Sequence, residues 1–387
     1  MANKESIRFG IIGVGGMGAN HARSILAGKV PGLELVAVAD KEEKKMEPFP
    51  DVAHFGSGED LIESADLDAV LIATPHYSHT TLGIQALKAG LHLLVEKPIS
   101  VHKEDCEKLI DAYSKDSGQI FAAMFNQRTD YRYRKVKELI SSGELGTLQR
   151  LNWVITDWFR SETYYQSGGW RATWAGEGGG VLLNQCPHQL DLWQWLFGMP
   201  DRLTARCQIG RFHEIEVEDS VTALMEYESG MQGVFVTTTG EAPGVNRLEV
   251  VGDNGRLEIT GDDVIHYDRN EIPTQKFLKE STTGFGKPGC WDVSIPTRGK
   301  GEQHNGILKN FVGAIRGDEA LIAPAEEGIH SVELANAMLL SSFRDAPVEL
   351  PMDSSEYAAE LKKKIAESKP EKKVIREIST EDFNRSF

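Results

Sequence analysis

The sequence places a lysine directly after an apolar run and directly before a proline. Lys97 follows Glu96 and precedes Pro98, after the run His92–Val95. A charged pair at the end of a buried strand points into a cleft, because a core would not accept it, and the proline keeps Lys97 extended. A partly desolvated lysine can hydrogen-bond a reacting oxygen and relay its proton. The alternative is a surface lysine paired with Glu96.

A second group of candidate residues comes much later in the chain. Three glycines at 178–180 are followed by Asn184, and His188 comes directly after Pro187. Proline suits the first turn of a helix. Asp191 then lies on the same helix face as His188, where it could orient the imidazole and tune its charge. The alternative is a buried helix that carries one hydrogen-bonded histidine.

The third candidate is a glycine-rich turn near the start of the chain. The pattern Gly13-x-Gly15-x-x-Gly18, which encloses Gly16 and Met17, follows an apolar run and opens a helical stretch. In this context the first glycine permits a tight turn, the second lets a pyrophosphate approach the backbone, and the third lets the helix pack on the sheet. The helix N-terminus then faces the phosphates. The alternative is a tight turn without a ligand.

Asp40 ends the next apolar run, 22 residues after Gly18. A carboxylate at this place binds the adenosine ribose of NAD and repels the 2′-phosphate of NADP. NAD is therefore the expected cofactor and NADP is disfavoured, although Lys41 beside the carboxylate would soften the discrimination. The alternative is an aspartate that only starts the next turn.

Two further segments are expected at the same edge of the sheet. Thr74-Pro75 follows the apolar run Ala69–Ala73, where open α/β sheets bind ligands, and shapes a loop under the cofactor. His79 begins the next helix. Because His76 and His79 have no third ligand candidate nearby, structural or cofactor-contact roles are favoured over a metal site.

Six of the seven tryptophans fall between Trp153 and Trp195. Aromatic faces beside polar side chains suit a pyranose ring, because its C–H surface stacks while its hydroxyls are hydrogen-bonded. Trp193 and Trp195 are assigned to the core or to an interface. The residues expected to line a substrate site are Trp158, Arg160, Tyr165, Trp170, Trp174, Asn184 and His188.

The helices and strands that must position these residues follow two different sequence patterns. Residues 7–126 alternate short apolar runs with amphipathic stretches, which is typical of a doubly wound parallel sheet. The apolar runs are Ile7–Ile12, Leu33–Ala39, Ala69–Ala73, His92–Val95 and Ile120–Phe125, and the helical stretches are Asn20–Ala27, Thr80–Ala89 and Lys103–Ser114.

After residue 126 the pattern indicates an α/β domain with a large, mostly antiparallel sheet that helices cover on one face. Strands are expected at 148–158, 202–210, 220–227, 232–239, 248–251 and 256–259, and helices at 132–141, 306–316 and 325–342. Residues 268–303 are rich in Gly, Pro, Thr and Lys and are interpreted as a long excursion, a lid or a subunit contact. The expected divisions are 1–126, a dinucleotide-binding domain, 127–352, a substrate-binding and oligomerisation domain, and 353–387, a charged tail.

Composition narrows the class of protein. A chain of 387 residues exceeds what one core usually serves, so two domains are expected. The formal charge of −16 argues against nucleic acid and anionic membranes as partners. No apolar run is long enough to span a bilayer, and the first residues lead directly into a strand, so no signal peptide is expected. Four scattered cysteines fit a reducing cytoplasm: Cys106, Cys186, Cys207 and Cys290.

The combination of motifs resembles the Gfo/Idh/MocA oxidoreductases, the relatives of glucose–fructose oxidoreductase and inositol dehydrogenase. The resemblance covers about residues 5–345 and is carried by Gly13–His21, Ala73-Thr74-Pro75, Glu96-Lys97-Pro98, Asn126-Gln127-Arg128 and the glycine–asparagine–histidine segment. It implies a Rossmann domain plus an open-faced α/β domain whose sheet mediates a homodimer or homotetramer. It also implies a tightly held NAD or NADP and a sugar, inositol or similar polyol substrate.

By this resemblance Lys97 is the catalytic lysine, His188 is the acid/base, and Glu96 contacts the nicotinamide ribose. Many members carry aspartate where this chain has Asn184, which can position a substrate but cannot take a proton, and Cys186 replaces a usual glycine. The residues expected to bind the cofactor are Gly13, Gly15, Gly16, Met17, Gly18, Asp40, Thr74, Pro75, His79, Glu96 and Lys97.

The sequence thus predicts a cytoplasmic, NAD-preferring dehydrogenase that oxidises a ring secondary alcohol of a cyclic sugar, glycoside or inositol, without a metal. His188, together with Lys97, would take the hydroxyl proton. Two alternatives stay open. One is a glycoside hydrolase that retains its NAD and uses a tyrosine at 164 or 165 as an extra base, which net NADH formation would distinguish. The other is a non-catalytic sugar or cofactor sensor.

Overall fold

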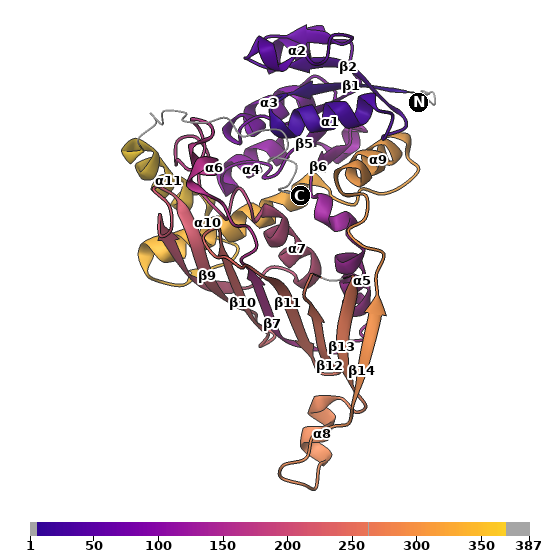
Figure 1. Cartoon of the computed structure of the whole chain (residues 1–387), viewed down its shortest axis with the longest axis vertical. Helices are drawn as coiled ribbons and strands as arrows, with labels where there is room; N and C mark the ends of the chain where they lie inside the picture. Colours follow the sequence, from indigo (N-terminus) through magenta and orange to yellow (C-terminus); the bar gives the residue numbers. More distant parts are fainter. Residues whose placement is uncertain (1–5, 262, 369–387) are drawn as a thin grey trace.

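Two β-sheets organise the chain, and helices pack against both (Figure 1). The computed structural model describes residues 6–261 and 263–368. The expectations for the first five residues and for the end of the tail, 369–387, lie outside this range. Among the described residues, no helix is long and apolar enough to cross a membrane.

The N-terminal sheet has six parallel strands in the order β3-β2-β1-β4-β5-β6. Its strands are β1 (Ile7–Ile12), β2 (Leu33–Ala39), β3 (Ala53–Phe55), β4 (Ala69–Ile72), β5 (His92–Val95) and β6 (Phe121–Ala123). Its helices are α1 (Gly16–Leu26), α2 (Gly58–Ser64), α3 (Tyr77–Lys88) and α4 (Lys103–Asp111). The strand order reverses between β1 and β4, and open α/β sheets bind ligands in the crevice at such a switch point. The expected parallel sheet is confirmed.

The C-terminal sheet has nine strands in the order β14-β13-β12-β11-β7-β10-β9-β8-β15. Its strands are β7 (Leu148–Ile155), β8 (Arg202–Ile209), β9 (Glu218–Glu226), β10 (Gln232–Thr238), β11 (Asn246–Gly252), β12 (Gly255–Ile259), β13 (Val264–Asn270), β14 (Cys290–Pro296) and β15 (Val348–Glu349). All neighbours are antiparallel except β7 and β10. The expected large, mostly antiparallel sheet is confirmed.

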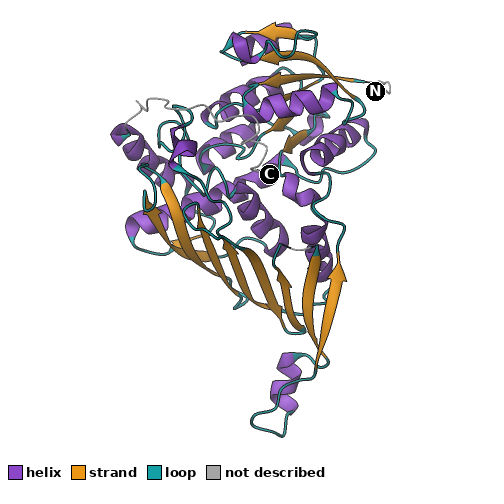
Figure 2. Cartoon of the chain, viewed as in Figure 1, coloured by secondary structure: helices purple, strands orange, loops and turns teal. Residues whose placement is uncertain are grey.

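Helices cover one face of this large sheet (Figure 2). They are α5 (Tyr131–Ser141), α7 (Pro187–Phe197) and α10 (Gly328–Arg344). Trp193 of α7 packs on Phe235 of β10, with ring centroids 6.0 Å apart, so this tryptophan is a core residue as expected. The helices lie between the large sheet and the N-terminal unit, and the opposite face of the sheet carries no helix of the described residues.

The segment 268–303 differs from the expected excursion. Strands β13 and β14 pair over their whole length and add two strands to the large sheet, with helix α8 (Thr274–Glu280) at the tip of the hairpin. Ile265 and Tyr267 point into the core, whereas His266 between them is exposed. Strands with one solvent-exposed face carry no continuous apolar run, which is why composition alone suggested a loop.

The chain returns to the N-terminal unit near its end. Helix α9 (Gln303–Arg316) contributes Ile307 and Phe311 to the core of the parallel sheet, where Phe311 meets Phe9 with ring centroids 6.4 Å apart. The described part of the charged tail forms helix α11 (Ser354–Glu367). The remaining short elements are α6 (Glu162–Gln166) and the 3₁₀ turns η1 (Glu43–Lys45), η2 (Lys115–Ser117), η3 (Asn126–Thr129) and η4 (Ala325–Glu327).

Candidate active site

The glycine turn between β1 and α1 leaves open space beside the backbone. Gly13 has a φ of +88°, and a Cβ there would lie 2.7 Å from the carbonyl oxygen of Ala73. A Cβ on Gly18 would overlap the Gly13 carbonyl, so this glycine lets α1 pack closely. Gly15, in contrast, has nothing within 4 Å of its Cβ position. Helix α1 begins at Gly16, so its N-terminus faces a space in which phosphates fit.

Asp40 lies beside this turn. One of its carboxylate oxygens accepts the Val14 N–H at 3.0 Å, and the other accepts the Glu42 N–H at 3.0 Å. The hydroxyl of Thr74 is buried and has no hydrogen-bond partner among the described residues. An open glycine turn, an adjacent carboxylate and an unused buried hydroxyl fit the ribose and phosphate groups of a dinucleotide.

His79 is fully buried and connects two loops at the end of the sheet. Its Nδ1 lies 2.8 Å from the Pro98 carbonyl oxygen, and its Nε2 lies 2.8 Å from that of Thr74. Of the two roles considered for this histidine, the contacts are those of a structural link that fixes the loop after β4 against the loop after β5. No group of three or more potential metal ligands gathers in the described part of the chain.

Glu96 is buried at the end of β5 and contacts His21 of α1. The carboxylate Oε1 lies 2.7 Å from His21 Nε2. Burial by itself would raise the pKa of Glu96, but the hydrogen bond and charge of His21 outweigh it and hold this pKa at about 2. His304, at the start of α9, lies with its ring centroid 5.5 Å from that of His21, and burial lowers its pKa to about 4. Glu96 therefore stays ionised.

Lys97 bridges the two halves of the molecule. Its Nζ donates to the backbone carbonyl of Asn184 at 2.9 Å, and its own N–H donates to Glu96 Oε2 at 3.2 Å. Burial lowers the pKa of Lys97, and the negative charges of Glu96 and Glu177 oppose this effect. The lysine and the asparagine that the sequence placed in different domains thus meet in one site.

His188 lies at the start of α7 and is 5% exposed. Its Nδ1 is buried and has no hydrogen-bond partner among the described residues. Burial lowers its pKa well below the ordinary value for histidine, and the positive charge of Lys97 lowers it further. The imidazole is therefore neutral at physiological pH and able to accept a proton.

The expectation that Asp191 orients His188 is wrong. Both oxygens of Asp191 accept from Arg128, at 2.8 and 2.6 Å, and a third bond comes from Gln194 at 3.2 Å. Arg128 also donates to Glu327 at 2.6 Å. Helical spacing places two side chains on one face, but it does not reveal which cation from another segment captures the carboxylate.

A polar network surrounds the side chain of Asn184. Its Oδ1 accepts from the Tyr164 hydroxyl at 3.2 Å and from Gln185 Nε2 at 3.1 Å, and its Nδ2 donates to Glu177. The Tyr164 hydroxyl in turn accepts from Arg171 at 2.8 Å and from Gln185 at 3.1 Å. Arg171 and Glu177 were not among the expected site residues, and Tyr164 was considered only as an extra base of the alternative hydrolase, although all three lie in the tryptophan-rich segment.

Three of the aromatic and cationic side chains expected near a substrate lie around this network. The Arg160 guanidinium carbon is 5.5 Å from the centroid of Trp158 and 5.1 Å from that of Tyr164. Trp170 lies with its centroid 5.8 Å from that of His76, whose pKa burial lowers to about 3.

Two other expected substrate residues lie in the core. Tyr165 is 2% exposed and its hydroxyl is 2.7 Å from that of Thr239, so Tyr164 takes the place that we assigned to it. Trp174 is 4% exposed and packs on Phe343 with centroids 5.9 Å apart. Tyr165 and Trp174 are therefore not included in the proposed substrate site.

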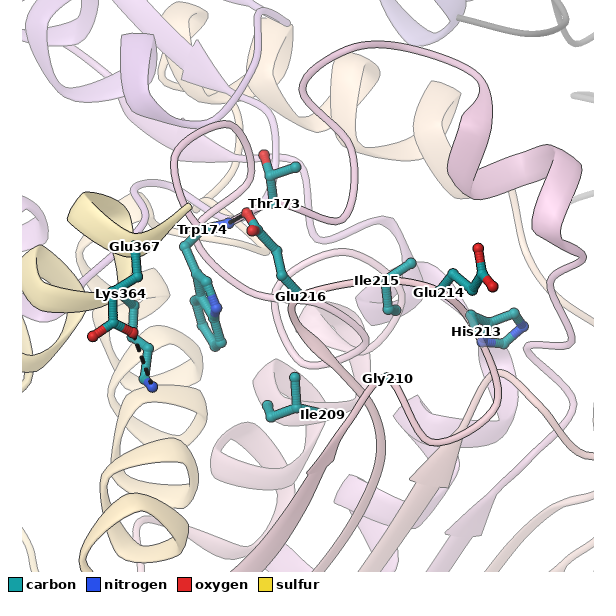
Figure 3. Close-up of a pocket in the computed structure, with 10 residues that line it drawn as sticks. All are labelled: Thr173, Trp174, Ile209, Gly210, His213, Glu214, Ile215, Glu216, Lys364 and Glu367. Atoms are coloured by element: carbon teal, nitrogen blue, oxygen red, sulfur yellow. Dashed lines mark hydrogen bonds and ion pairs between the residues drawn. The ribbon is translucent and has the colours of Figure 1, made fainter. Parts of the chain in front are cut away.

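A cavity of about 710 Å³ lies between the segment that contains Trp174, the loop after β8 and helix α11 (Figure 3). None of the expected catalytic residues contributes to its wall. It is lined by Thr173, Trp174, Ile209, Gly210, His213, Glu214, Ile215, Glu216, Lys364 and Glu367. We place the active site at Lys97 rather than at this cavity, because the candidate acid–base groups converge at Lys97.

Comparison with known proteins identifies the family of this chain. Residues 7–124 match the NAD-binding Rossmann fold of an oxidoreductase family, and residues 133–258 match the GFO/IDH/MocA C-terminal domain. The chain therefore belongs to the Gfo/Idh/MocA oxidoreductases. It is an NAD-binding oxidoreductase, as expected, and nothing in the comparisons favours the hydrolase or the sensor over this class.

Two relatives illustrate the sequence similarity. Inositol 2-dehydrogenase 3 of Saccharopolyspora erythraea is 29% identical over 264 residues, which cover 66% of this chain and 73% of that protein. The uncharacterized oxidoreductase YdgJ of Escherichia coli is 31% identical over 201 residues, which cover 52% of this chain and 56% of that protein.

Solved structures share the fold over most of the chain. The WlbA dehydrogenase from Chromobacterium violaceum, in complex with NADH and UDP-GlcNAcA, has a TM-score of 0.77 and 25% identity, covering 91% of this chain and 98% of its own. Levoglucosan dehydrogenase, in complex with NADH and levoglucosan, has a TM-score of 0.75 and 20% identity, covering 90% of this chain and all of its own, a likeness of fold alone.

Proposed function

We propose that this enzyme oxidises a secondary alcohol on the ring of a cyclic sugar, glycoside or inositol, with NAD as the hydride acceptor. One observation carries the proposal: Lys97, at the end of β5, donates to the backbone of Asn184 in the other half of the molecule. This contact supports the proposal, because it brings a lysine suited to acid–base chemistry next to the aromatic segment of the other half. The inositol and sugar dehydrogenases among the similar proteins support the substrate class.

His188 and Lys97 divide the work of moving the hydroxyl proton. His188 accepts the proton, because its lowered pKa keeps the imidazole neutral before the reaction and its buried Nδ1 has no hydrogen-bond partner among the described residues. The Lys97 ammonium stabilises negative charge that develops on the oxygen. A well-placed general base is worth roughly 10²–10⁴-fold in rate.

The surrounding side chains suit a ring with hydroxyls on its rim. Trp158 and Trp170 offer aromatic faces, and the Arg171 guanidinium lies 4.6 Å from the Trp170 ring and 4.7 Å from the Tyr164 ring. The C–H surface of a sugar stacks on such rings, while guanidinium and amide groups bind its hydroxyls.

The Tyr164 contacts also weigh against the NAD-retaining hydrolase. Its hydroxyl donates one bond and accepts two, which uses its full hydrogen-bonding capacity. Both lone pairs of the phenol oxygen accept N–H groups, so neither is available to accept a carbon-bound proton in this arrangement. Tyr165, the other candidate base, is buried against Thr239.

Replacing Lys97 tests the proposal. Cyclic polyols, sugars and glycosides are first screened with NAD for NADH absorbance. With the best substrate, Lys97→Met should keep NAD binding and the unfolding temperature while kcat falls at least about 10²-fold. The matched control is Lys115→Met, whose side chain is 83% exposed and should leave kcat unchanged. Turnover within a few-fold of wild type in Lys97→Met would contradict the catalytic role.

A further inference from the structure

Glu177 is a buried carboxylate inside the site that no motif indicated. It is 2% exposed and directly precedes the glycine run at 178–180. One oxygen accepts the Ala172 N–H at 2.6 Å, and the other accepts from Asn184 Nδ2. Burial raises its pKa, and the positive charge of Arg171 is the largest opposing influence. A buried acid with these partners is held by its neighbours on both oxygens.

The contacts of Asn184 fix which way its amide faces. Its Oδ1 is already used as an acceptor by Tyr164 and Gln185. An ionised carboxylate can only accept hydrogen bonds, so the atom that faces Glu177 must be the amide nitrogen. An aspartate at position 184 would instead set two carboxylates against each other, and close carboxylates cannot both stay ionised.

From this geometry we infer that Glu177 is the positioning residue of the active site and that it acts through Asn184. The Glu177 carboxylate orients the side chain of Asn184, and the backbone carbonyl of Asn184 accepts a hydrogen bond from the Lys97 ammonium. Glu177 and Asn184 are thus an acceptor–donor pair in which neither member can change alone. The catalytic consequence of the pair rests on the proposed function, whereas the pairing itself does not.

Exchanging the two functional groups tests the pairing. Asn184→Asp creates the carboxylate pair, and Glu177→Gln together with Asn184→Asp restores one donor facing one acceptor. In the double variant the glutamine oxygen still accepts the Ala172 N–H, and the new aspartate still accepts from Tyr164. We expect Asn184→Asp to lower kcat at least about tenfold and the double variant to recover most of that loss.

Thermal unfolding gives a readout that needs no substrate. In Asn184→Asp one carboxyl group has a folded pKa above its unfolded value, so the folded state is favoured below the unfolded pKa and loses stability as pH rises towards the folded pKa. The unfolding temperature should therefore fall between pH 5 and pH 8 by at least about 2 °C more than in wild type. The double variant should follow the wild-type curve.

The control and the contrary outcomes are distinct. Glu214→Gln removes an exposed carboxylate from the nearby cavity wall and should change neither kcat nor the pH dependence of unfolding. The pairing is overturned if the double variant is no better than Asn184→Asp in both measurements, or if Asn184→Asp behaves as wild type at every pH. If wild type turns over no tested alcohol, the proposed function fails, while the unfolding curves still decide the pairing.

Discussion

The protonation states of Lys97 and His188, where the two halves of the molecule meet, depend on burial and on neighbouring charges. Lys97 and His188 each have a lowered pKa, and burial is the first cause for both. The two positive forms also repel each other, so charging His188 beside the Lys97 ammonium is disfavoured. This leaves one cation and one neutral base, which is the arrangement that proton removal from an alcohol requires.

Asp40 should determine the choice of cofactor. Its carboxylate is held beside the glycine turn by the Val14 and Glu42 N–H groups, and Lys45 Nζ lies 3.9 Å from it. A carboxylate that faces the 2′-phosphate of NADP costs on the order of 1 kcal/mol or more, so NAD should bind at least about tenfold more tightly.

Fluorescence titration of NAD and NADP measures this ratio. Asp40→Asn removes the charge but keeps a hydrogen-bond acceptor for the glycine turn. The variant should therefore stay folded while the preference for NAD over NADP becomes smaller. Glu59→Gln, an exposed carboxylate on α2, is the control and should keep the wild-type ratio. Equal affinities in the unmodified protein would refute the role of Asp40.

The sequence indicated candidate residues of the site but not their contacts. Lys97, Asn184 and His188 became candidates through the combination of motifs and the family resemblance, and the structure brings Lys97 into contact with Asn184. Tyr164 and Tyr165 were not distinguishable, because adjacent residues of the short helix α6 face different sides, and sequence does not set that phase. Glu177 was missed because a single acid before a glycine run resembles any polar loop residue.

At the scale of elements, burial determined what could be predicted. Strands β1, β2, β4 and β5 are mostly apolar, and the expected limits agree with the structure to within a residue. Strand β3 and the β13–β14 hairpin were missed because they lie at or next to a sheet edge, and exposed residues interrupt their apolar pattern. Sequence patterns report burial, so elements at an edge leave only a weak signal.

Helix α7 should depend on Arg128 for its position. Arg128 is 1% exposed, comes from η3 at the junction of the two halves, and holds Asp191 of α7 with two hydrogen bonds. Arg128→Gln would leave that buried carboxylate without its cation, which costs about 3–5 kcal/mol. The unfolding temperature should fall clearly, and kcat should fall with it because α7 carries His188.

The pH dependence of this variant has a definite sign. Burial already raises the pKa of Asp191, and loss of Arg128 raises it further. An acid with a folded pKa above its unfolded value loses stability as pH rises, so the deficit of Arg128→Gln against wild type should grow from pH 5 to pH 8. The surface pair Lys135–Glu138 gives the control, since Lys135→Gln should cost below about 1 kcal/mol. A constant deficit across this range would contradict the explanation.

The whole molecule is held together by segments distant in sequence. Helix α9 returns to the N-terminal core between strands β14 and β15 of the large sheet, and Lys103 of α4 donates to Glu333 of α10 at 2.8 Å. Amphipathic patterning indicated that these helices exist but not against which sheet they pack. Long-range docking of this kind depends on side-chain fit, which a single sequence does not display.

The uncovered face of the large sheet leads to a prediction about assembly. Leu224 is 41% exposed there and pairs with Val234 of β10, while Val236 pairs with Val154 of β7 on the same face. Adjacent apolar side chains on an open sheet are typical of a surface that another chain covers. We expect a second copy of this chain to cover it, because a two-fold interface brings the same patch from both partners together.

Sedimentation or light scattering should therefore give a mass of two or four chains. Leu224→Glu introduces a carboxylate near the contact in each partner, so like charges meet and the assembly should shift towards monomer by at least about tenfold in its dissociation constant. Leu26→Glu is the matched control, because Leu26 is 52% exposed at the end of α1, far along the chain from the sheet. A monomeric wild type, or an assembly that both variants leave intact, would show that the sheet face is not the interface.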